Sequence, residues 1–215
     1  ENYKEEFLAF VIHSGALKFG NFVLKSGRTS PYFFDTGAFS SGKSLSQLAK
    51  AYAYAINDTD IDFEVLFGPA YKGIPLVCTI AVAWSEIYVR DIGFCFNRKE
   101  QKNHGERGLM VGWPVKGKIL IVDDVISAGS SVRESIKIIK DHEAFPTGVM
   151  ITLDRQERGE SSISAAEEVR RNLGLKVESI VTFSDIVQYL EAAGNYEMEL
   201  KNLKSYHQIY GAEDE

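Results

Sequence analysis

The chain has 215 residues, 45% of them hydrophobic, and a formal net charge of −6 at pH 7. This length suits a single domain with a sizeable core, and the acidic balance argues against a general nucleic-acid-binding protein or a membrane-surface protein. Neither of the two cysteines has the spacing of a metal site, and the sequence shows no secretion signal and no apolar run long enough to span a bilayer. We therefore expect a reduced, cytoplasmic protein that binds neither membrane nor nucleic acid.

The first part of the chain predicts a helix followed by a hairpin. Apolar residues recur at helical spacing between Phe7 and Ile12, and residues 19–24 and 32–34 read as two strands joined by a turn at residues 25–28. We interpret about residues 1–40 as a small N-terminal hood, or flap. A second helix is predicted from the apolar stripe that runs from Leu45 to Ile56.

Strands and helices alternate through the central part of the chain. Strand patterns cover residues 63–67, 94–97, 119–122, 149–153 and 177–181, and helical patterns cover residues 74–84, 132–140 and 164–173. Such alternation predicts an α/β fold with a mainly parallel, twisted sheet flanked by helices. We expect a single domain over residues 1–215, with its core at about residues 61–185 and with C-terminal helices and an acidic tail at residues 186–215.

The segment at residues 119–131 carries the most specific chemistry. Four apolar residues lead to Asp123 and Asp124, a loop of small residues follows, and helical periodicity begins at Val132. Because the loop lies at the carboxyl end of a parallel strand, its amides, the helix N-terminus and the serine hydroxyls form an anion site. Two adjacent carboxylates would repel a phosphate, so we expect them to accept hydrogen bonds from sugar hydroxyls, directly or through a divalent ion. The segment therefore predicts a sugar-phosphate site.

Residues 98–108 form a basic segment that reads Arg-Lys-Glu-Gln-Lys-Asn-His-Gly-Glu-Arg-Gly. It contains no apolar residue with which it could anchor itself in a core. One interpretation is a solvated charged loop, which most charge runs are. The other is a lid that brings Arg, Lys and His onto an anionic substrate and neutralises the charge on a leaving group.

Three further features belong to the predicted site. Residues 68–73, which lie between a strand and a helix, place Lys72 at the same sheet edge as the two acids, and a helix cap alone does not explain an exposed lysine beside an aromatic residue. Phe33 and Phe34 are neighbours on a strand and point to opposite faces, so one suits the core and the other can stack on a flat base. Arg155 follows the strand at residues 149–153, and its position alone predicts an ordinary surface arginine.

Taken together, these segments closely resemble the orotate phosphoribosyltransferases, which are type I phosphoribosyltransferases. Residues 119–131 are similar to the family's phosphoribosyl-diphosphate signature, and residues 98–106 fill every fixed position of its catalytic-loop pattern, Arg-Lys-Glu-x-Lys-x-His-Gly-Glu. Residues 68–73 resemble its pyrophosphate loop, and residues 25–28 and 32–34 its N-terminal substrate segment. One departure is visible: Ser127 and Ser130 stand where the family usually has Thr, which keeps the hydroxyl donors.

The resemblance implies an activity and a set of site residues. The activity would be Mg²⁺-dependent transfer of the phosphoribosyl group from phosphoribosyl diphosphate (PRPP) to orotate, giving orotidine 5′-phosphate and pyrophosphate in pyrimidine nucleotide synthesis. The implied catalytic residues are Arg98, Lys99, Lys102 and His104. The residues implied to bind PRPP are Lys25, Tyr71, Lys72, Asp123, Asp124, Val125, Ile126, Ser127, Ala128, Gly129, Ser130 and Ser131. The residues implied to bind orotate are Phe33, Phe34, Ser127 and Arg155.

Two partners of the site are also implied by the resemblance. Mg²⁺ would be held mainly through the substrate, with Asp123 and Asp124 as further ligands. The family forms homodimers, so the segment Arg98–Gly108 would serve the neighbouring subunit.

Two alternatives come from other classes of protein. Residues 37–44, Gly-Ala-Phe-Ser-Ser-Gly-Lys-Ser, fit the phosphate-loop pattern of NTPases. Such a loop requires a buried parallel strand before it, whereas the preceding segment reads as a hairpin strand and Ser40–Ser44 reads as an ordinary helix start. The other alternative is a PRPP-sensing regulator that binds nucleic acid. The acidic total and the lack of an appended DNA-reading helix pair weigh against it.

Overall fold

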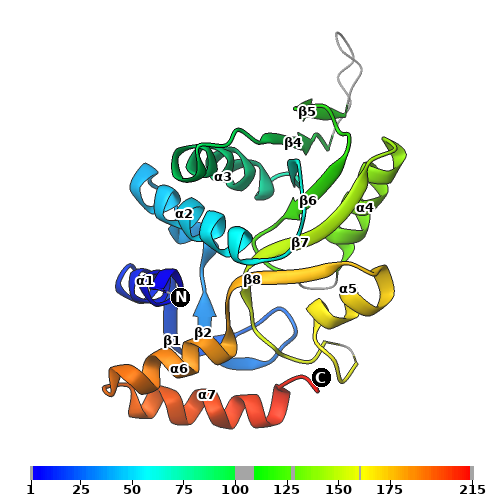
Figure 1. Ribbon diagram of the computed structural model, residues 1–215. Helices are drawn as coiled ribbons and strands as arrows, with labels where there is room; N and C mark the ends of the chain where they lie inside the picture. Colours follow the sequence, from blue (N-terminus) through cyan, green and yellow to red (C-terminus); the bar gives the residue numbers. More distant parts are fainter. Residues whose placement is uncertain (1, 100–108, 127–128, 160, 214–215) are drawn as a thin grey trace.

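The computed structural model describes residues 2–99, 109–126, 129–159 and 161–213, and its centre is a six-stranded sheet between two layers of helices (Figure 1). The strand order is β5-β4-β3-β6-β7-β8, and only the edge strand β5 is antiparallel to its neighbour. This confirms the predicted α/β fold with a mainly parallel sheet. The strands are β3 (Val65–Gly68), β4 (Gly93–Asn97), β5 (Met110–Gly112), β6 (Lys118–Val122), β7 (Phe145–Asp154) and β8 (Lys176–Thr182).

Helices cover both faces of this sheet, because its strands are apolar on both sides. Helices α2 (Gly42–Asp58) and α3 (Gly73–Tyr88) lie on one face, and α4 (Ser130–Asp141) and α5 (Ala165–Leu173) lie on the other (Figure 1). Along β3, Leu66 packs into the core under α2 and α3, whereas Phe67 packs into the core under α4 and α5. Buried parallel strands of this kind read as continuous apolar runs, which is why they were visible in the sequence.

The N-terminal segment forms the predicted helix and hairpin beside the sheet. Helix α1 (Asn2–His13) is followed by β1 (Leu17–Val23) and β2 (Thr29–Phe34), which pair antiparallel. Two C-terminal helices, α6 (Phe183–Ala193) and α7 (Glu197–Tyr210), lie below the sheet, and α7 packs against β2 (Figure 1).

The sequence did not predict the edge strand β5. It has only three residues, too few to show an alternating pattern, and its position depends on pairing with β4. Gly112 has a φ of +101°, and a Cβ atom there would lie 2.4 Å from the carbonyl oxygen of Phe94. A glycine is therefore required for this close approach of two backbones.

The NTPase alternative is wrong. Residues 36–38 form a short 3-10 helix (η1, Thr36–Ala38) directly after the hairpin strand β2, so no buried parallel strand precedes the motif. Helix α2 then begins with a capping box, in which the Ser41 side chain accepts from the Ser44 amide and the Ser44 side chain accepts from the Ser41 amide. The serines of the motif serve as helix caps, which explains their presence without a nucleotide.

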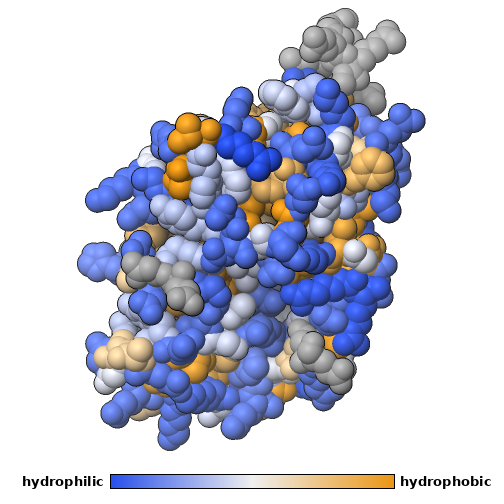
Figure 2. Space-filling model, viewed as in Figure 1, coloured by the Kyte–Doolittle hydropathy of each residue, from blue (hydrophilic) through white to orange (hydrophobic). Residues whose placement is uncertain are grey.

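The outer surface is mostly hydrophilic in the view of Figure 2, with apolar residues in scattered patches. Of the helices that the structure describes, none has the length and apolar character that a membrane crossing requires.

Candidate active site

The candidate site lies where the connections from two central strands diverge. Strands β3 and β6 are neighbours, but the connection after β3 leads through α3 and the connection after β6 leads through α4, on opposite faces of the sheet. In open α/β sheets, ligands bind at the carboxyl ends of strands at such a switch point. Both predicted loops, residues 68–73 and residues 123–131, start there.

The acid pair after β6 is buried and held from several sides. Asp123 and Asp124 have exposed fractions of 8% and 7%. Carboxylate oxygens of Asp123 accept hydrogen bonds from the Asp124 amide and from the Ser131 hydroxyl, both at 2.9 Å. The backbone of the pair is fixed by Tyr52, whose hydroxyl donates to the Asp123 carbonyl oxygen at 2.8 Å, and by Thr152, whose amide donates to the Asp124 carbonyl oxygen.

Burial raises the pKa of Asp123 to about 6, and the nearby carboxylate of Asp124 adds to this shift. The hydrogen bonds from the Asp124 amide and the Ser131 hydroxyl act in the opposite direction, because they stabilise the charged form. The site thus holds a carboxylate that gains a proton more readily than an exposed one. A strongly perturbed acid in a cleft is a feature typical of functional sites.

Lys72 contacts the second acid. Its Nζ donates to Asp124 Oδ2 at 2.8 Å, and the Thr36 hydroxyl donates to the same oxygen at 3.0 Å. The hydrogen bond with Asp124 raises the pKa of Lys72 and is the largest cause of that shift. The lysine side chain remains 71% exposed, so its ammonium is also accessible to a ligand. The structure therefore brings together Lys72 and the acid pair, as the sequence predicted.

The N-terminus of α4 has the geometry of an anion site. Helix α4 follows Gly129, which adopts a left-handed conformation with a φ of +66° and makes no side-chain cap. The first amides of the helix are thus left for a ligand to use. Ser130 is exposed, and the hydroxyl of Ser131 donates to Asp123 Oδ2 at 2.9 Å. Ser127 and Ala128 lie outside the described residues. Val125 is 40% exposed and Ile126 packs partly buried against the core under α4.

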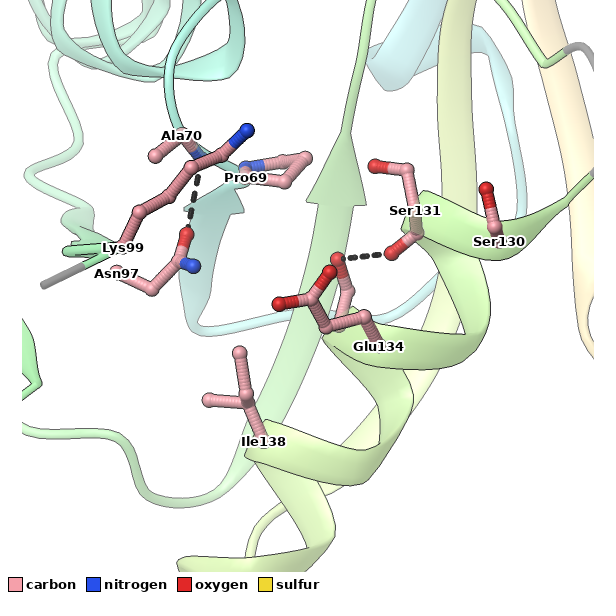
Figure 3. A pocket seen from close by; sticks show the side chains of 9 residues that line it. Pro69, Ala70, Asn97, Lys99, Ser130, Ser131, Glu134 and Ile138 are labelled. Atoms are coloured by element: carbon pink, nitrogen blue, oxygen red, sulfur yellow. Dashed lines mark hydrogen bonds between the residues drawn. The ribbon is translucent and has the colours of Figure 1, made fainter.

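A cavity of about 220 Å³ opens between the two loops, as Figure 3 shows. Pro69 and Ala70 form one wall, and the Ala70 amide donates to Asn97 Oδ1 at 2.8 Å. Residues from the first turns of α4 form the opposite wall. The remaining lining comes from these two elements and the end of β4: Lys99, Ser130, Ser131, Glu134, Ser135 and Ile138.

The basic segment begins at the rim of this cavity. Arg98 bonds through its amide to the Leu109 carbonyl oxygen, and Lys99 lines the cavity with its Nζ 5.1 Å from the centre of the Tyr71 ring. Tyr71 is 65% exposed. Lys102 and His104, with the rest of residues 100–108, lie outside the described residues.

The hairpin presents its two phenylalanines to different sides, as expected. Phe34 packs into the core against Phe7 and Phe39, with ring centres 6.5 Å and 6.1 Å away. Phe33 is 39% exposed and its ring lies against that of Phe22. Lys25 is exposed in the turn between the strands. Of the two rings, Phe33 is therefore the one available to a ligand.

Arg155 is not an ordinary surface arginine. Its side chain is 23% exposed, and its guanidinium lies over the Tyr32 ring at 3.9 Å from the ring centre. Nη2 donates to the Ser30 hydroxyl at 2.8 Å, and Nε donates to Glu157 Oε1 at 2.9 Å. Sequence reasoning could not detect this anchoring, because Ser30 is 125 residues away in the chain.

Several residues of the site were missed by sequence reasoning. Thr36, Tyr52, Asn97 and Thr152 each hold a predicted site segment through one hydrogen bond or more. The Tyr52 and Thr152 hydroxyls also bond to each other at 2.5 Å. These residues lie on elements distant in sequence, and isolated Thr, Tyr or Asn residues within apolar patterns carry no local signal of such a role.

The described residues include no group of three or more His, Cys, Asp or Glu side chains that would hold a metal ion alone. Two buried carboxylate groups at one strand end are nevertheless suitable ligands for Mg²⁺, which usually takes one or two protein carboxylates and completes its shell with water and substrate oxygens. Asp123 and Asp124 therefore fit a metal that arrives with its substrate.

Comparison with known proteins agrees with this geometry. The family model of the phosphoribosyl transferase domain matches residues 36–184. The orotate phosphoribosyltransferase of Pseudoalteromonas translucida is 50% identical over 98% of this chain and 99% of its own length, and that of Klebsiella pneumoniae is 49% identical over 97% and 98%. The chain belongs to the orotate phosphoribosyltransferase family. The crystal structure of a family member from Francisella tularensis superposes with a TM-score of 0.87, is 39% identical, and covers 96% of this chain and 100% of its own.

Membership of the orotate phosphoribosyltransferases accounts for the grouping of the two loops at one switch point. The family match includes Thr36 at its start and Phe183 near its end, so it spans the sheet and its helices but leaves out the hairpin strands and α7. The two relatives that are 50% and 49% identical to this chain align with these parts as well.

Proposed function

We propose that the protein transfers the phosphoribosyl group of PRPP to orotate, giving orotidine 5′-phosphate and pyrophosphate in pyrimidine nucleotide synthesis. The observation that carries this proposal is the meeting of Lys72, the buried acid pair and the N-terminus of α4 at one switch point. A sugar that bears a phosphate and a diphosphate requires a cation, hydroxyl acceptors and an anion site together. Orotate phosphoribosyltransferases that are 49–50% identical to this chain over nearly its whole length support the choice of orotate.

The proposed roles follow from the chemistry of each group. The loop at residues 125–131 and the first amides of α4 bind the 5′-phosphate, while Asp123 and Asp124 accept hydrogen bonds from the ribose hydroxyls. Lys72, with Tyr71 beside it, holds the pyrophosphate. Because Lys72 already lies 2.8 Å from Asp124 Oδ2, one side-chain movement carries its charge from the acid to the leaving group.

The reaction forms one bond and breaks another at the anomeric carbon. The ring nitrogen of orotate loses its proton to solvent and bonds to that carbon on one face. The bond to the pyrophosphate oxygen breaks on the other face, and its electron pair leaves with pyrophosphate. Negative charge therefore grows on the leaving group as the bond breaks. Cations placed around that group stabilise the transition state more than the ground state.

Mg²⁺ would be held by the diphosphate and ribose oxygens of PRPP, with Asp123 and Asp124 as protein ligands. Bound there, it would supply positive charge to the leaving group. The protein's own part is to fix the acid pair, through Tyr52, Thr152 and Ser131, where the sugar hydroxyls arrive.

The basic segment completes the proposed site. We assign Arg98, Lys99, Lys102 and His104 to neutralising the pyrophosphate, with Lys102 as the rate-critical cation and His104 as a proton donor near neutral pH. By family resemblance, the chain forms a homodimer in which Arg98–Gly108 serves the neighbouring subunit. On the base side, Phe33, Ser127 and Arg155 receive orotate, and Phe34 anchors the strand of Phe33 in the core. Lys25 contributes to PRPP binding, and the protein works in the cytoplasm.

The test is to mix purified protein, Mg²⁺ and PRPP with orotate, uracil, adenine or hypoxanthine, and to follow the loss of each base. We expect orotate alone to be consumed. Lys102→Ala should lower kcat at least about a hundredfold with a smaller change in the KM for PRPP, because a contact made in the transition state appears in turnover. Consumption of another base, or an unchanged kcat in Lys102→Ala, would contradict the respective assignment.

A further inference from the structure

We propose that Glu157 and Tyr206 are positioning residues for the base pocket: Glu157 fixes the guanidinium of Arg155, and Tyr206 on the C-terminal helix α7 fixes Glu157. The inference rests on the proposed function, because Arg155 is taken to contact orotate. It adds two residues that the motifs do not include, and one of them, Tyr206, lies on α7, which is outside the family match at residues 36–184.

Glu157 holds one edge of Arg155. Its Oε1 lies 2.9 Å from Arg155 Nε and 2.7 Å from Nη2. Nη2 also donates to Ser30, and the guanidinium plane rests on the Tyr32 ring. The arginine is thus fixed in plane and direction, which suits a guanidinium that donates to an anionic ligand.

The other oxygen of Glu157 connects the pocket to the C-terminus. The Tyr206 hydroxyl donates to Glu157 Oε2 at 3.1 Å, and Arg28 Nη1 lies 3.9 Å from the same oxygen. The Glu157 side chain is only 10% exposed. A carboxylate buried to this degree is stable only with such partners, so its position is strongly determined.

The backbone before Glu157 is fixed by the same C-terminal region. Gln156 has a φ of +50°, an uncommon conformation for a residue with a side chain. Its side-chain oxygen accepts from the amide and the hydroxyl of Ser184, and its carbonyl oxygen accepts from the Ala212 amide. Residues in uncommon backbone conformations persist where the surroundings over-determine them, and they gather at functional sites.

These contacts give α7 a role in substrate binding. The hairpin, β7 and α7 meet at Arg155, although they are far apart in the sequence. If the hydrogen bonds between Glu157 and Arg155 are lost, the buried guanidinium keeps its charge but no longer has a fixed direction. Orotate binding should then weaken, whereas the PRPP contacts at the end of β6 are made by other residues and should not change.

The experiment measures the KM for orotate, the KM for PRPP, kcat and the melting temperature of the full-length protein in several variants. Glu157→Ala should raise the KM for orotate about tenfold or more and leave the KM for PRPP within about twofold, in the range expected for removing a charged hydrogen-bond partner. Glu157→Gln keeps an acceptor but loses the charge, so it should fall between wild type and Glu157→Ala. Tyr206→Phe should raise the KM for orotate about threefold.

Two comparisons separate positioning from a general structural effect. Tyr206→Phe should have no further effect in the Glu157→Gln background, because both changes act through one guanidinium. The matched control is Tyr210→Phe. Tyr210 lies one turn further along α7, and its ring lies under Arg28 and Arg158. The phenylalanine keeps that ring, so this variant should leave the KM for orotate unchanged.

The outcomes distinguish this inference from the proposed function. If Arg155→Lys raises the KM for orotate but the Glu157 and Tyr206 variants do not, the positioning role is wrong and the proposed function stands. Equal increases in both KM values, with a lowered melting temperature, would also overturn it, because they indicate general damage. A wild-type protein that does not consume orotate would instead refute the proposed function. Should Glu157→Ala not fold, Glu157→Gln and Tyr206→Phe still decide.

Discussion

At the scale of single residues, Asp123 carries the clearest conflict between stability and function. Its carboxylate is buried beside a second carboxylate, and its pKa is raised from 3.8 to about 6. The folded protein therefore binds this proton more tightly than the unfolded chain does. Stability from this group is fully present below about pH 4 and is lost as the pH rises to about 6. At neutral pH the charged form of Asp123 therefore lowers the stability of the folded protein, and only this form has the full acceptor capacity that the proposed contact with sugar hydroxyls requires.

Replacing Asp123 by Asn should remove that cost. We expect Asp123→Asn to be more stable than wild type at pH 7, by about 3 kcal/mol from the size of the pKa shift, with little difference at pH 4, and to lose transferase activity. Urea unfolding at both pH values measures the first effect. Asp60→Asn is the control: Asp60 is exposed, its pKa is lowered by Lys176, and its loss should bring no gain at pH 7. Equal stability of Asp123→Asn and wild type at pH 7 would contradict the burial argument.

At the scale of elements, the loop between β3 and α3 depends on two glycines in contact. A Cβ atom on Gly68 would lie 2.2 Å from the Gly73 carbonyl oxygen and 2.8 Å from Val77. The loop that carries Lys72 can therefore close only without a side chain at this position. Gly68→Ala should destabilise the fold by about 1–3 kcal/mol, as overpacking does, and should raise the KM for PRPP.

A matched substitution is available in α2. Gly42 has open space around its Cβ position and lies at the start of the helix, so Gly42→Ala should stabilise the protein by about 0.4–1 kcal/mol. Denaturant unfolding of both variants tests the pair. Gly42 is also one of the glycines of the NTPase pattern at residues 37–44, and the Gly42→Ala variant should keep full transferase activity. A stable Gly68→Ala with normal PRPP kinetics would show that the loop does not need this contact.

A helix or strand was predictable from the sequence where a pattern within that segment alone indicates it. The strand–acid–loop–helix sequence at residues 119–131 and the apolar stripe of α2 are local patterns, and the structure has both. The three-residue strand β5 and the anchoring of Arg155 were not predictable, because each depends on a partner far along the chain. The same holds for Tyr52 and Thr152, which read as ordinary residues of a helix and a strand until their hydroxyls are found 2.5 Å apart. The structural role of such residues is determined by their tertiary partners and not by local sequence preference.

At the scale of the whole molecule, an acidic chain must attract a substrate with several negative charges. The net charge of −6 opposes this approach, so binding depends on the local cations and amides at the switch point. Charges on the surface are screened by salt, whereas the buried acid pair is screened much less. Association with PRPP should therefore be governed by a small region and not by the overall charge.

Ligand-induced stabilisation tests this view on the intact protein. Anything that binds the folded state alone stabilises it by an amount set by its concentration, about 2.7 kcal/mol at 100 times the Kd. For a chain of this size that corresponds to a rise in Tm of roughly 5–10 °C with Mg²⁺ and PRPP. Mg²⁺ alone and Mg²⁺ with ATP are the controls, and neither should raise the Tm by more than about a degree if residues 37–44 form a helix start.

Two variants locate the source of the shift. The double variant Asp123→Asn, Asp124→Asn should lose it, because both acceptors for the ribose hydroxyls are gone, whereas Lys72→Met should reduce it by weakening the hold on pyrophosphate. The shift is read as the difference between the Tm with and without ligand, so the higher intrinsic stability expected of Asp123→Asn does not interfere. A full shift in the double variant would mean that PRPP binds away from the end of β6. A shift produced by ATP in wild type would instead contradict the interpretation of residues 37–44 as a helix start.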